Sequence, residues 1–79
     1  MNKDTQQTIS TSDIVLAATL KIKGFTLNRI EKSGNKGVFI FEDVDSSVVK
    51  DYDLGKCLVE PVAFNNAIKA LTTATRRIF

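Results

Sequence analysis

The sequence predicts an α+β domain built on an antiparallel β-hairpin that two main helices cover. Residues 37–43 contain a run of four large apolar residues, Val38-Phe39-Ile40-Phe41, which is typical of a buried strand. The segment 25–30 ahead of it alternates apolar and polar residues, and two longer segments, 10–23 and 61–78, show helical periodicity. We therefore expect the order α-β-β-α-(β)-α, in which the bracketed strand is short.

Length and composition limit the chain to one domain and argue against several kinds of site. A chain of 79 residues is near the lower size at which a single core holds a fold. We expect residues 1–9 to form a flexible N-terminal segment, or at most a short edge strand, and residues 10–79 to form a single domain. With one cysteine and no histidine, we expect no disulfide, no metal site and no cofactor.

The same composition argues against an enzyme and against a membrane protein. The chain has no histidine, the usual proton carrier near neutral pH, and it has no phosphate-binding loop or dinucleotide-binding motif. Its longest apolar run is far shorter than the roughly 20 residues that span a bilayer, and its N-terminus has no apolar signal core. We expect a non-enzymatic, cytoplasmic protein without a small-molecule substrate.

The first predicted helix begins near Ser10 and ends before Gly24. Ser10 at the N-cap places Asp13 three residues later, which is the spacing of a capping box, and Thr11 and Ser12 are alternative caps. Gly24 tolerates the left-handed backbone conformation that ends many helices.

This helix is apolar on two nearly opposite sides. One side carries Ile14, Val15, Ala18 and Ile22, and the other carries Leu16, Ala17 and Leu20. Such a helix needs cover on both sides. Either the last helix and the sheet cover both, or one side is left for a partner molecule. We expect the second side to be left free, with a contact made by Leu16, Leu20 and Lys23.

The two strands of the hairpin have different patterns. The first, from residue 25 to residue 30, alternates for three residues and then slips phase at Ile30, which indicates a bulge or an early exit from pairing. Residues 33–37 supply two glycines and an asparagine for the turn that joins it to the second strand.

A short helix follows the hairpin. Asp45-Ser46-Ser47 is typical of a helix cap, and the helix is expected to run to about Asp53 and to be closed by Gly55. Residues 56–59 are a candidate third strand, because a lone hairpin needs either another strand or a covering helix.

The last helix has the clearest amphipathic pattern and starts with Pro61 in its first turn. Its apolar face consists of Ala63, Phe64, Ala67, Ile68, Ala70, Leu71, Ala74 and Ile78. We expect this face to lie on the hairpin, with Phe64 and Leu71 supplying most of the buried area.

Charge is divided between two regions of the chain. Residues 21–36 hold five basic residues and one acidic residue, whereas residues 42–53 hold five acidic residues and one basic residue. The acidic set consists of Glu42, Asp43, Asp45, Asp51 and Asp53. On the polar face of the last helix, Lys69 and Arg76 lie two turns apart, with Arg77 nearby, in an arrangement that suits a phosphate backbone.

Several patterns of caps, core residues and turns occur together over residues 10–79. They are Thr11-Ser12-Asp13, Leu16-Ala17-Ala18, Leu20, Gly24, Phe39-x-Phe41-Glu42-Asp43, Val59, Phe64 and Leu71. In these the chain resembles a family of small domains of unknown function from phages and from bacterial or mobile-element genomes. The resemblance implies a shared fold and carries no activity, cofactor or catalytic residue with it.

The favoured prediction is a small accessory or adaptor domain of phage or mobile-element origin. It would dock on a larger protein or nucleoprotein complex, or on a second copy of itself, through the free side of the first helix. One alternative is direct binding of nucleic acid by Lys69, Arg76 and Arg77. Another is inhibition of a nucleic-acid-binding enzyme by the acidic set.

Overall fold

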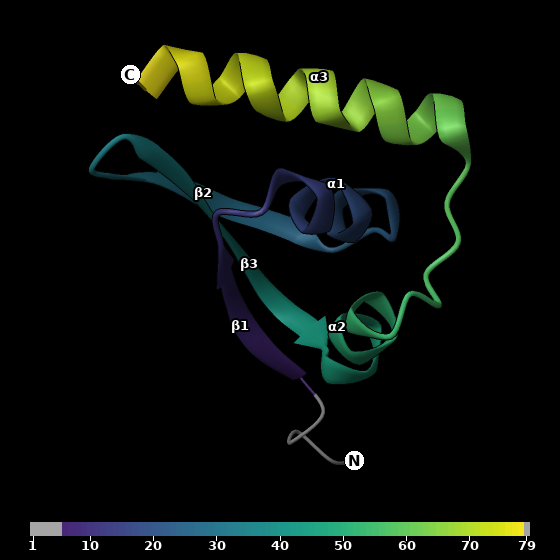
Figure 1. The fold of residues 1–79 in the computed structure, drawn as a ribbon. Helices are drawn as coiled ribbons and strands as arrows, with labels where there is room; N and C mark the ends of the chain where they lie inside the picture. The colour runs from purple at the N-terminus through teal and green to yellow at the C-terminus, as the bar shows by residue number, and fades with distance from the viewer. Residues whose placement is uncertain (1–5, 79) are drawn as a thin grey trace.

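The computed structural model describes residues 6–78, which form a three-stranded antiparallel sheet and three helices (Figure 1). In chain order, the elements are β1 (Gln6–Thr11), α1 (Ile14–Ile22), β2 (Thr26–Ser33), β3 (Lys36–Asp45), α2 (Ser46–Asp53) and α3 (Pro61–Ile78). The α+β class, the hairpin of β2 and β3, and the presence of a third strand are as predicted.

The third strand is not the one that the sequence favoured. The sheet order is β1-β3-β2, so β3 is central and pairs on both sides. Residues 56–59 belong instead to the connection between α2 and α3. Residues 6–9 lie in the edge strand β1, so over these residues the alternative expectation, a short edge strand, is confirmed and the flexible segment is not. The first five residues of that segment lie outside the described part of the chain.

Strand β3 supplies the centre of the core, and its pairing with each neighbouring strand contains one irregularity. Phe39 and Phe41 point to the helices, and a bulge then turns Val44 to the same face instead of Asp43. Asp43 has a φ of 57°, a left-handed conformation that suits such a bulge. The second irregularity, an extra β2 residue between Leu27 and Arg29, confirms the predicted slip of phase in that strand.

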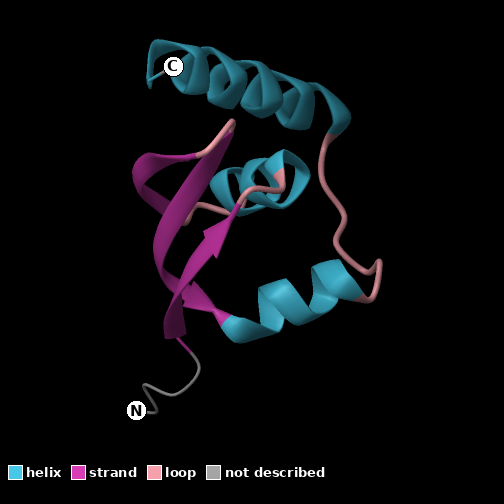
Figure 2. Ribbon diagram, turned by 60° about the vertical axis from the view of Figure 1, so that its left-hand side comes forward, coloured by secondary structure: helices cyan, strands magenta, loops and turns pink. Residues whose placement is uncertain are grey.

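Helix α1 lies inside the molecule, with the sheet, α3 and α2 around it (Figure 2). Five consecutive residues, Leu16 to Leu20, are buried. The two apolar sides of this helix are therefore explained by cover from its own chain: α3 packs across it, and β3 lies against it as well.

The ends of α1 are fixed by local hydrogen bonds. The N-cap is Asp13 itself, because the expected cap residues Ser10 and Thr11 are part of β1. At the other end, Gly24 with φ 96° ends the helix as predicted. Its N–H donates to Lys21, while the N–H of Phe25 donates to Leu20, which is the Schellman pattern.

Helices α2 and α3 have acidic residues at their starts. Asp45 caps α2 as predicted, and its Oδ1 accepts a hydrogen bond of 3.0 Å from the Ser47 N–H. The Glu60 carboxylate accepts from the N–H groups of Val62 and Ala63 at 2.8 and 2.9 Å, and so caps α3 ahead of Pro61.

Helix α3 lies mainly across α1 and contacts the hairpin less extensively than expected. Leu71 and Ala67 are its buried residues, and Phe64 is half-buried. Ala70 and Ile78 are exposed, contrary to the prediction, because α1 is narrower than the face that the sequence pattern assigned to burial.

The C-terminal half of α3 meets the start of β3 at Gly37. A Cβ atom on Gly37 would lie 2.9 Å from Cγ2 of Thr75, so the close approach of strand and helix depends on glycine at this position. This contact sets the position of the candidate site described next.

Candidate nucleic-acid interface

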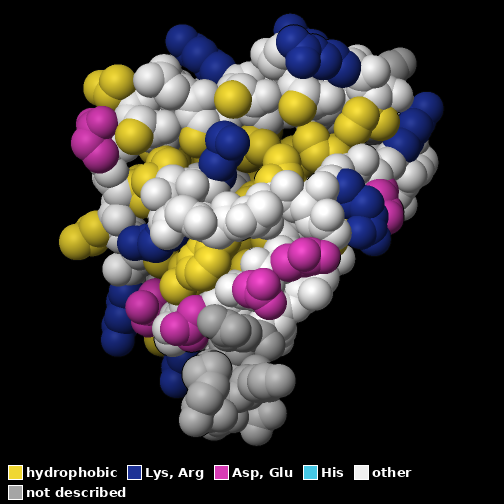
Figure 3. Space-filling view, turned by 180° about the vertical axis from the view of Figure 1, so that it is seen from behind, with side chains coloured by type: hydrophobic (Ala, Val, Ile, Leu, Met, Phe, Trp, Pro, Cys, Tyr) yellow, Lys and Arg dark blue, Asp and Glu magenta, His cyan; other side chains and the backbone are white. Residues whose placement is uncertain are grey.

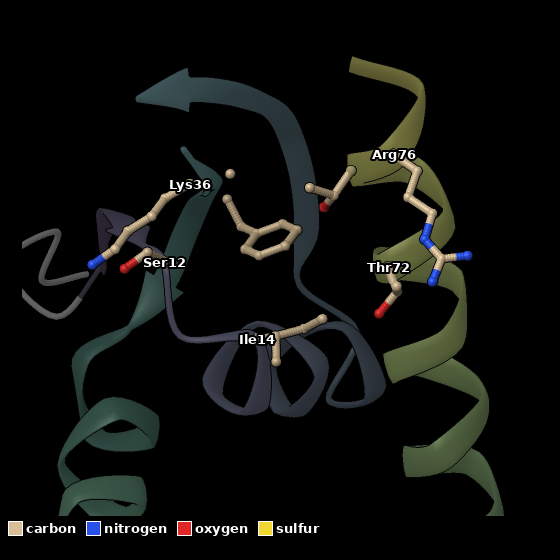
Figure 4. A pocket seen from close by; sticks show the side chains of 8 residues that line it. Ser12, Ile14, Lys36, Thr72 and Arg76 are labelled. Atoms are coloured by element: carbon tan, nitrogen blue, oxygen red, sulfur yellow. The ribbon is translucent and has the colours of Figure 1, made fainter. Parts of the chain in front are cut away.

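A pocket of about 360 Å³ lies between the entry to α1, the start of β3 and the C-terminal half of α3 (Figure 4). Its lining residues are Ser12, Ile14, Lys36, Gly37, Phe39, Thr72, Thr75 and Arg76. They come from three parts of the sequence and meet only because α3 returns over the sheet at Gly37.

The interior of the pocket is mostly apolar. Phe39 of β3 lines it, and Figure 4 shows the side chain of Ile14 in the space between β3 and α3. Phe39 belongs to the core, with 3% of its surface exposed, so its position is fixed by the fold rather than by a ligand. Gly37 also lines the pocket, at the point where Thr75 of α3 comes closest to β3.

Three residues with hydroxyl groups line the pocket: Ser12 ahead of α1, and Thr72 and Thr75 on α3. The hydroxyl of Thr72 donates to the carbonyl of Ile68 at 2.8 Å, and that of Thr75 donates to the carbonyl of Leu71 at 2.8 Å. Since both protons are used within the helix, each oxygen offers the pocket an acceptor rather than a donor.

Two cationic side chains flank the pocket. Lys36 extends from the start of β3 and Arg76 from α3, on opposite sides in Figure 4, and both are exposed. Within residues 6–78, neither makes an ion pair. The pocket thus combines an apolar interior and two acceptors with positive charge at its mouth.

One face of the molecule shows how part of its charge is distributed. In Figure 3, Lys and Arg side chains lie over α3 at the top and also in the lower half, whereas most of the visible Asp and Glu side chains lie in the lower half. The fold brings the hairpin turn near the C-terminal part of α3 and places α2 at the other end of β3 (Figure 1). On this face, the acidic side chains therefore lie mostly away from α3, while basic side chains lie in both halves.

The residues expected to form a docking surface on α1 are not available for it. Leu16 is 8% exposed and Leu20 is fully buried, and both belong to the core. Only Lys23, the C-cap of the helix, is exposed. The prediction of a contact through this side of α1 is wrong, because α3 and the sheet already cover it.

The residues expected to contact nucleic acid are all exposed on α3. Arg76 lines the pocket, and Lys69 lies seven residues earlier along the same helical line. Arg77 is exposed beside Arg76. Sequence reasoning missed Lys36 and Ser12 as their neighbours, because only the return of α3 over β3 joins these segments.

The acidic set is divided among structural tasks. Glu42 accepts a hydrogen bond of 2.7 Å from the side-chain amide of Asn28, and Asp45 caps α2. Asp43 occupies the bulge of β3, while Asp51 and Asp53 lie on α2. No group of three or more potential metal ligands occurs in the described part of the chain.

Comparison with known protein families decides the relationship of this chain. A model of the family described as a domain of unknown function, DUF5659, matches residues 6–76. The chain belongs to the DUF5659 family. The matched range begins with β1 and ends in the last turns of α3, so this DUF5659 domain includes every strand and helix of the fold.

No curated protein and no solved structure shows significant similarity to this DUF5659 domain. Among its described helices, none has both the length and the apolar character needed to cross a bilayer.

Proposed function

We propose that this DUF5659 domain is a non-enzymatic accessory domain that contacts nucleic acid through the pocket and the adjacent polar face of α3. We keep the accessory role expected from the sequence. The contacting surface, however, is the pocket at the start of β3 and the polar face of α3, rather than the apolar side of α1. The contacting cations are Lys36, Lys69, Arg76 and Arg77.

One observation carries this proposal: Lys36 and Arg76, from elements far apart in the sequence, flank the same pocket. Neither is neutralised by an acidic partner within residues 6–78. A phosphate backbone is a regular series of negative charges, and binding to it gains from the release of condensed cations. Lys69 extends the positive line along α3.

The acidic residues of α2 favour the approach of a polyanion to the pocket rather than to α2. Asp51 and Asp53 on α2 lie away from the pocket, so a polyanion is repelled from that end and attracted to the other (Figure 3). The small formal net charge of +2 therefore understates the attraction available at one face.

The test is a titration of labelled oligonucleotides at several salt concentrations. We expect the logarithm of the binding constant to fall linearly with the logarithm of salt concentration, since each phosphate contact contributes a slope of about −0.7 to −0.9. No detectable binding at low salt to any oligonucleotide would end the proposal.

A pair of double variants tests the location of the contact. Lys36→Gln with Arg76→Gln removes two cations at the pocket and should reduce the salt slope by roughly two phosphate contacts. Lys50→Gln with Lys56→Gln removes the same charge from α2 and the connection after it, and should change the slope little. Equal effects of the two pairs would show that binding follows net charge alone.

A protein partner is the second candidate, and the connection between α2 and α3 favours it. Leu54 and Leu58, in the connection, expose 56% and 86% of their surfaces, and Val62, in the first turn of α3, exposes 65%. The variant Leu58→Ser tests this directly: light scattering of the wild-type domain should show self-association that the variant loses. Monomers at all concentrations in both would remove a second copy as that partner.

A further inference from the structure

We propose that the pocket holds one unpaired base of a single-stranded nucleic acid, whose phosphates lie against Lys36 and Arg76. This inference rests on the proposed function and narrows the ligand to single strands. It arises from the order of chemical groups in the pocket: an apolar interior, two hydrogen-bond acceptors, then cations at the mouth.

The interior matches a flat heteroaromatic group better than it matches an anion. Ile14, which is half-buried, and the small exposed part of Phe39 present apolar surface that gains from covering an equally apolar base face. A phosphate or carboxylate placed inside would lose its water without receiving a hydrogen bond from these groups. The negative part of the ligand therefore belongs at the mouth.

The two threonine oxygens favour a ligand that carries N–H groups. Thr72 and Thr75 give their protons to the carbonyls of Ile68 and Leu71, so their oxygens are left to accept. Every base has an N–H donor on its Watson–Crick edge, and in a duplex that donor is already paired. An unpaired base can present this edge to the threonine oxygens, whereas in a paired base the same edge faces its partner.

Lys36 and Arg76 lie where a nucleic-acid strand would enter and leave the pocket. Lys36 and Arg76 lie on opposite sides of the pocket (Figure 4), so the phosphates before and after an inserted base each meet one positive charge. Lys69 continues the line along α3 for the next phosphate. A volume of about 360 Å³ is near the lower end of the range for small-molecule sites, and it accommodates one base.

The experiment compares three probes with the unmodified domain: a labelled single-stranded oligonucleotide, its duplex, and a single strand of the same length in which every nucleotide is abasic. We expect the first to bind roughly tenfold or more tightly than either of the others, because both of those lack an available base. Equal binding of all three would assign the surface to phosphates alone and overturn the inference while leaving the proposed function. Absence of binding by all three would overturn both.

Two variants locate the base. Thr72→Leu fills part of the pocket and removes an acceptor, and should abolish the preference for the single strand over the abasic strand. Thr73→Leu makes the same change at an exposed neighbour on α3 and should preserve it. A Thr72→Leu protein that folds, by its circular dichroism, and retains the full preference would place the base elsewhere.

A competition experiment separates nucleic acid from an acidic protein segment. Poly-aspartate should compete with the abasic strand but only weakly with the intact single strand. If it displaces the intact strand as effectively as unlabelled oligonucleotide does, the occupant is an acidic peptide and the base-binding inference is wrong.

Discussion

The hydroxyl of Tyr52 on α2 donates a hydrogen bond of 2.8 Å to Oδ2 of Asp13, the residue that caps α1. The other carboxylate oxygen of Asp13 accepts from the N–H groups of Val15 and Leu16. One carboxylate therefore starts α1 and holds α2 beside it. This bond links residues 39 positions apart in the chain.

Titration of Tyr52 should report this link. Burial, together with the hydrogen bond to Asp13 and the negative charge of that residue, raises the pKa of Tyr52 from 10.0 to about 12. A raised pKa in the folded state means that the contribution to stability is fully present below the unfolded value and is lost as pH rises through about 12. Because the chain has one tyrosine, tyrosinate absorbance measures it directly.

The control for that titration is Asp13→Asn, in which the charge is removed and the neutral side chain can still accept a hydrogen bond. The pKa of Tyr52 should fall toward its ordinary value in this variant. A wild-type pKa at the ordinary value, unchanged by Asp13→Asn, would show that the two side chains do not interact in solution.

Shortening side chains on α1 should lower stability more on its buried side than on its exposed side. Leu20 is fully buried, so Leu20→Ala should lower the free energy of unfolding by about 2–5 kcal/mol, through lost burial and the cavity that it leaves. Val15 is 43% exposed, and Val15→Ala should cost about 1 kcal/mol or less. Urea denaturation measures both changes.

The double variant Leu16→Asp with Leu20→Asp gives a sharper form of the same test. Two buried carboxylates without partners should prevent folding altogether. A folded double variant that has lost only self-association would restore the docking surface on α1 that the structure excludes.

The contact between Gly37 and Thr75 should be sensitive to a single methyl group. In Gly37→Ala the new Cβ meets Thr75 Cγ2 at 2.9 Å, and overpacking of this kind costs about 1–3 kcal/mol of stability. Thr75→Ser removes that methyl group and keeps the hydroxyl. The double variant should therefore recover much of the loss in a double-mutant cycle followed by thermal denaturation. Strict additivity would contradict the contact.

The cap of α3 should make stability depend on pH in the acidic range. Hydrogen bonds from the N–H groups of Val62 and Ala63 hold the pKa of Glu60 below its usual value of 4.5. A lowered pKa in the folded state means that this contribution is present above the unfolded pKa and is lost as pH falls through the folded pKa. Glu60→Gln should be less stable than wild type near neutral pH, and the difference in melting temperature should shrink in acid. A constant difference across pH would contradict the charged cap.

Features set by neighbouring residues could be predicted from the sequence. The cap at Asp45, the terminator at Gly24 and the slip of phase ahead of Ile30 each depend on a few consecutive residues. These local patterns predict the structure correctly because the backbone has few alternative conformations at such positions.

Features set by distant partners could not be predicted in the same way. Ile9 in β1 lies opposite Phe41 in β3, and little in the polar N-terminal segment indicates that pairing. Leu16 and Leu20 form an apolar side that fits an internal contact or an external one equally well, until the path of α3 is known.

The residues of the candidate site show the same difference between local and distant determinants. Arg76 stood out on the polar face of α3, since helical spacing alone places it with Lys69. Lys36 belonged to a turn, and only the approach of Thr75 to Gly37 brings it to the same pocket.

The order β1-β3-β2 has a consequence for synthesis of the chain. Strand β1 leaves the ribosome first, yet its only neighbour within the described sheet is β3, whose pairing residues 39–45 come last among the strands. The hairpin of β2 and β3 can close by itself with a short loop, whereas β1 must wait. Until then its backbone donors are satisfied by water, and a growing chain stopped before residue 39 has no sheet in which β1 can be placed.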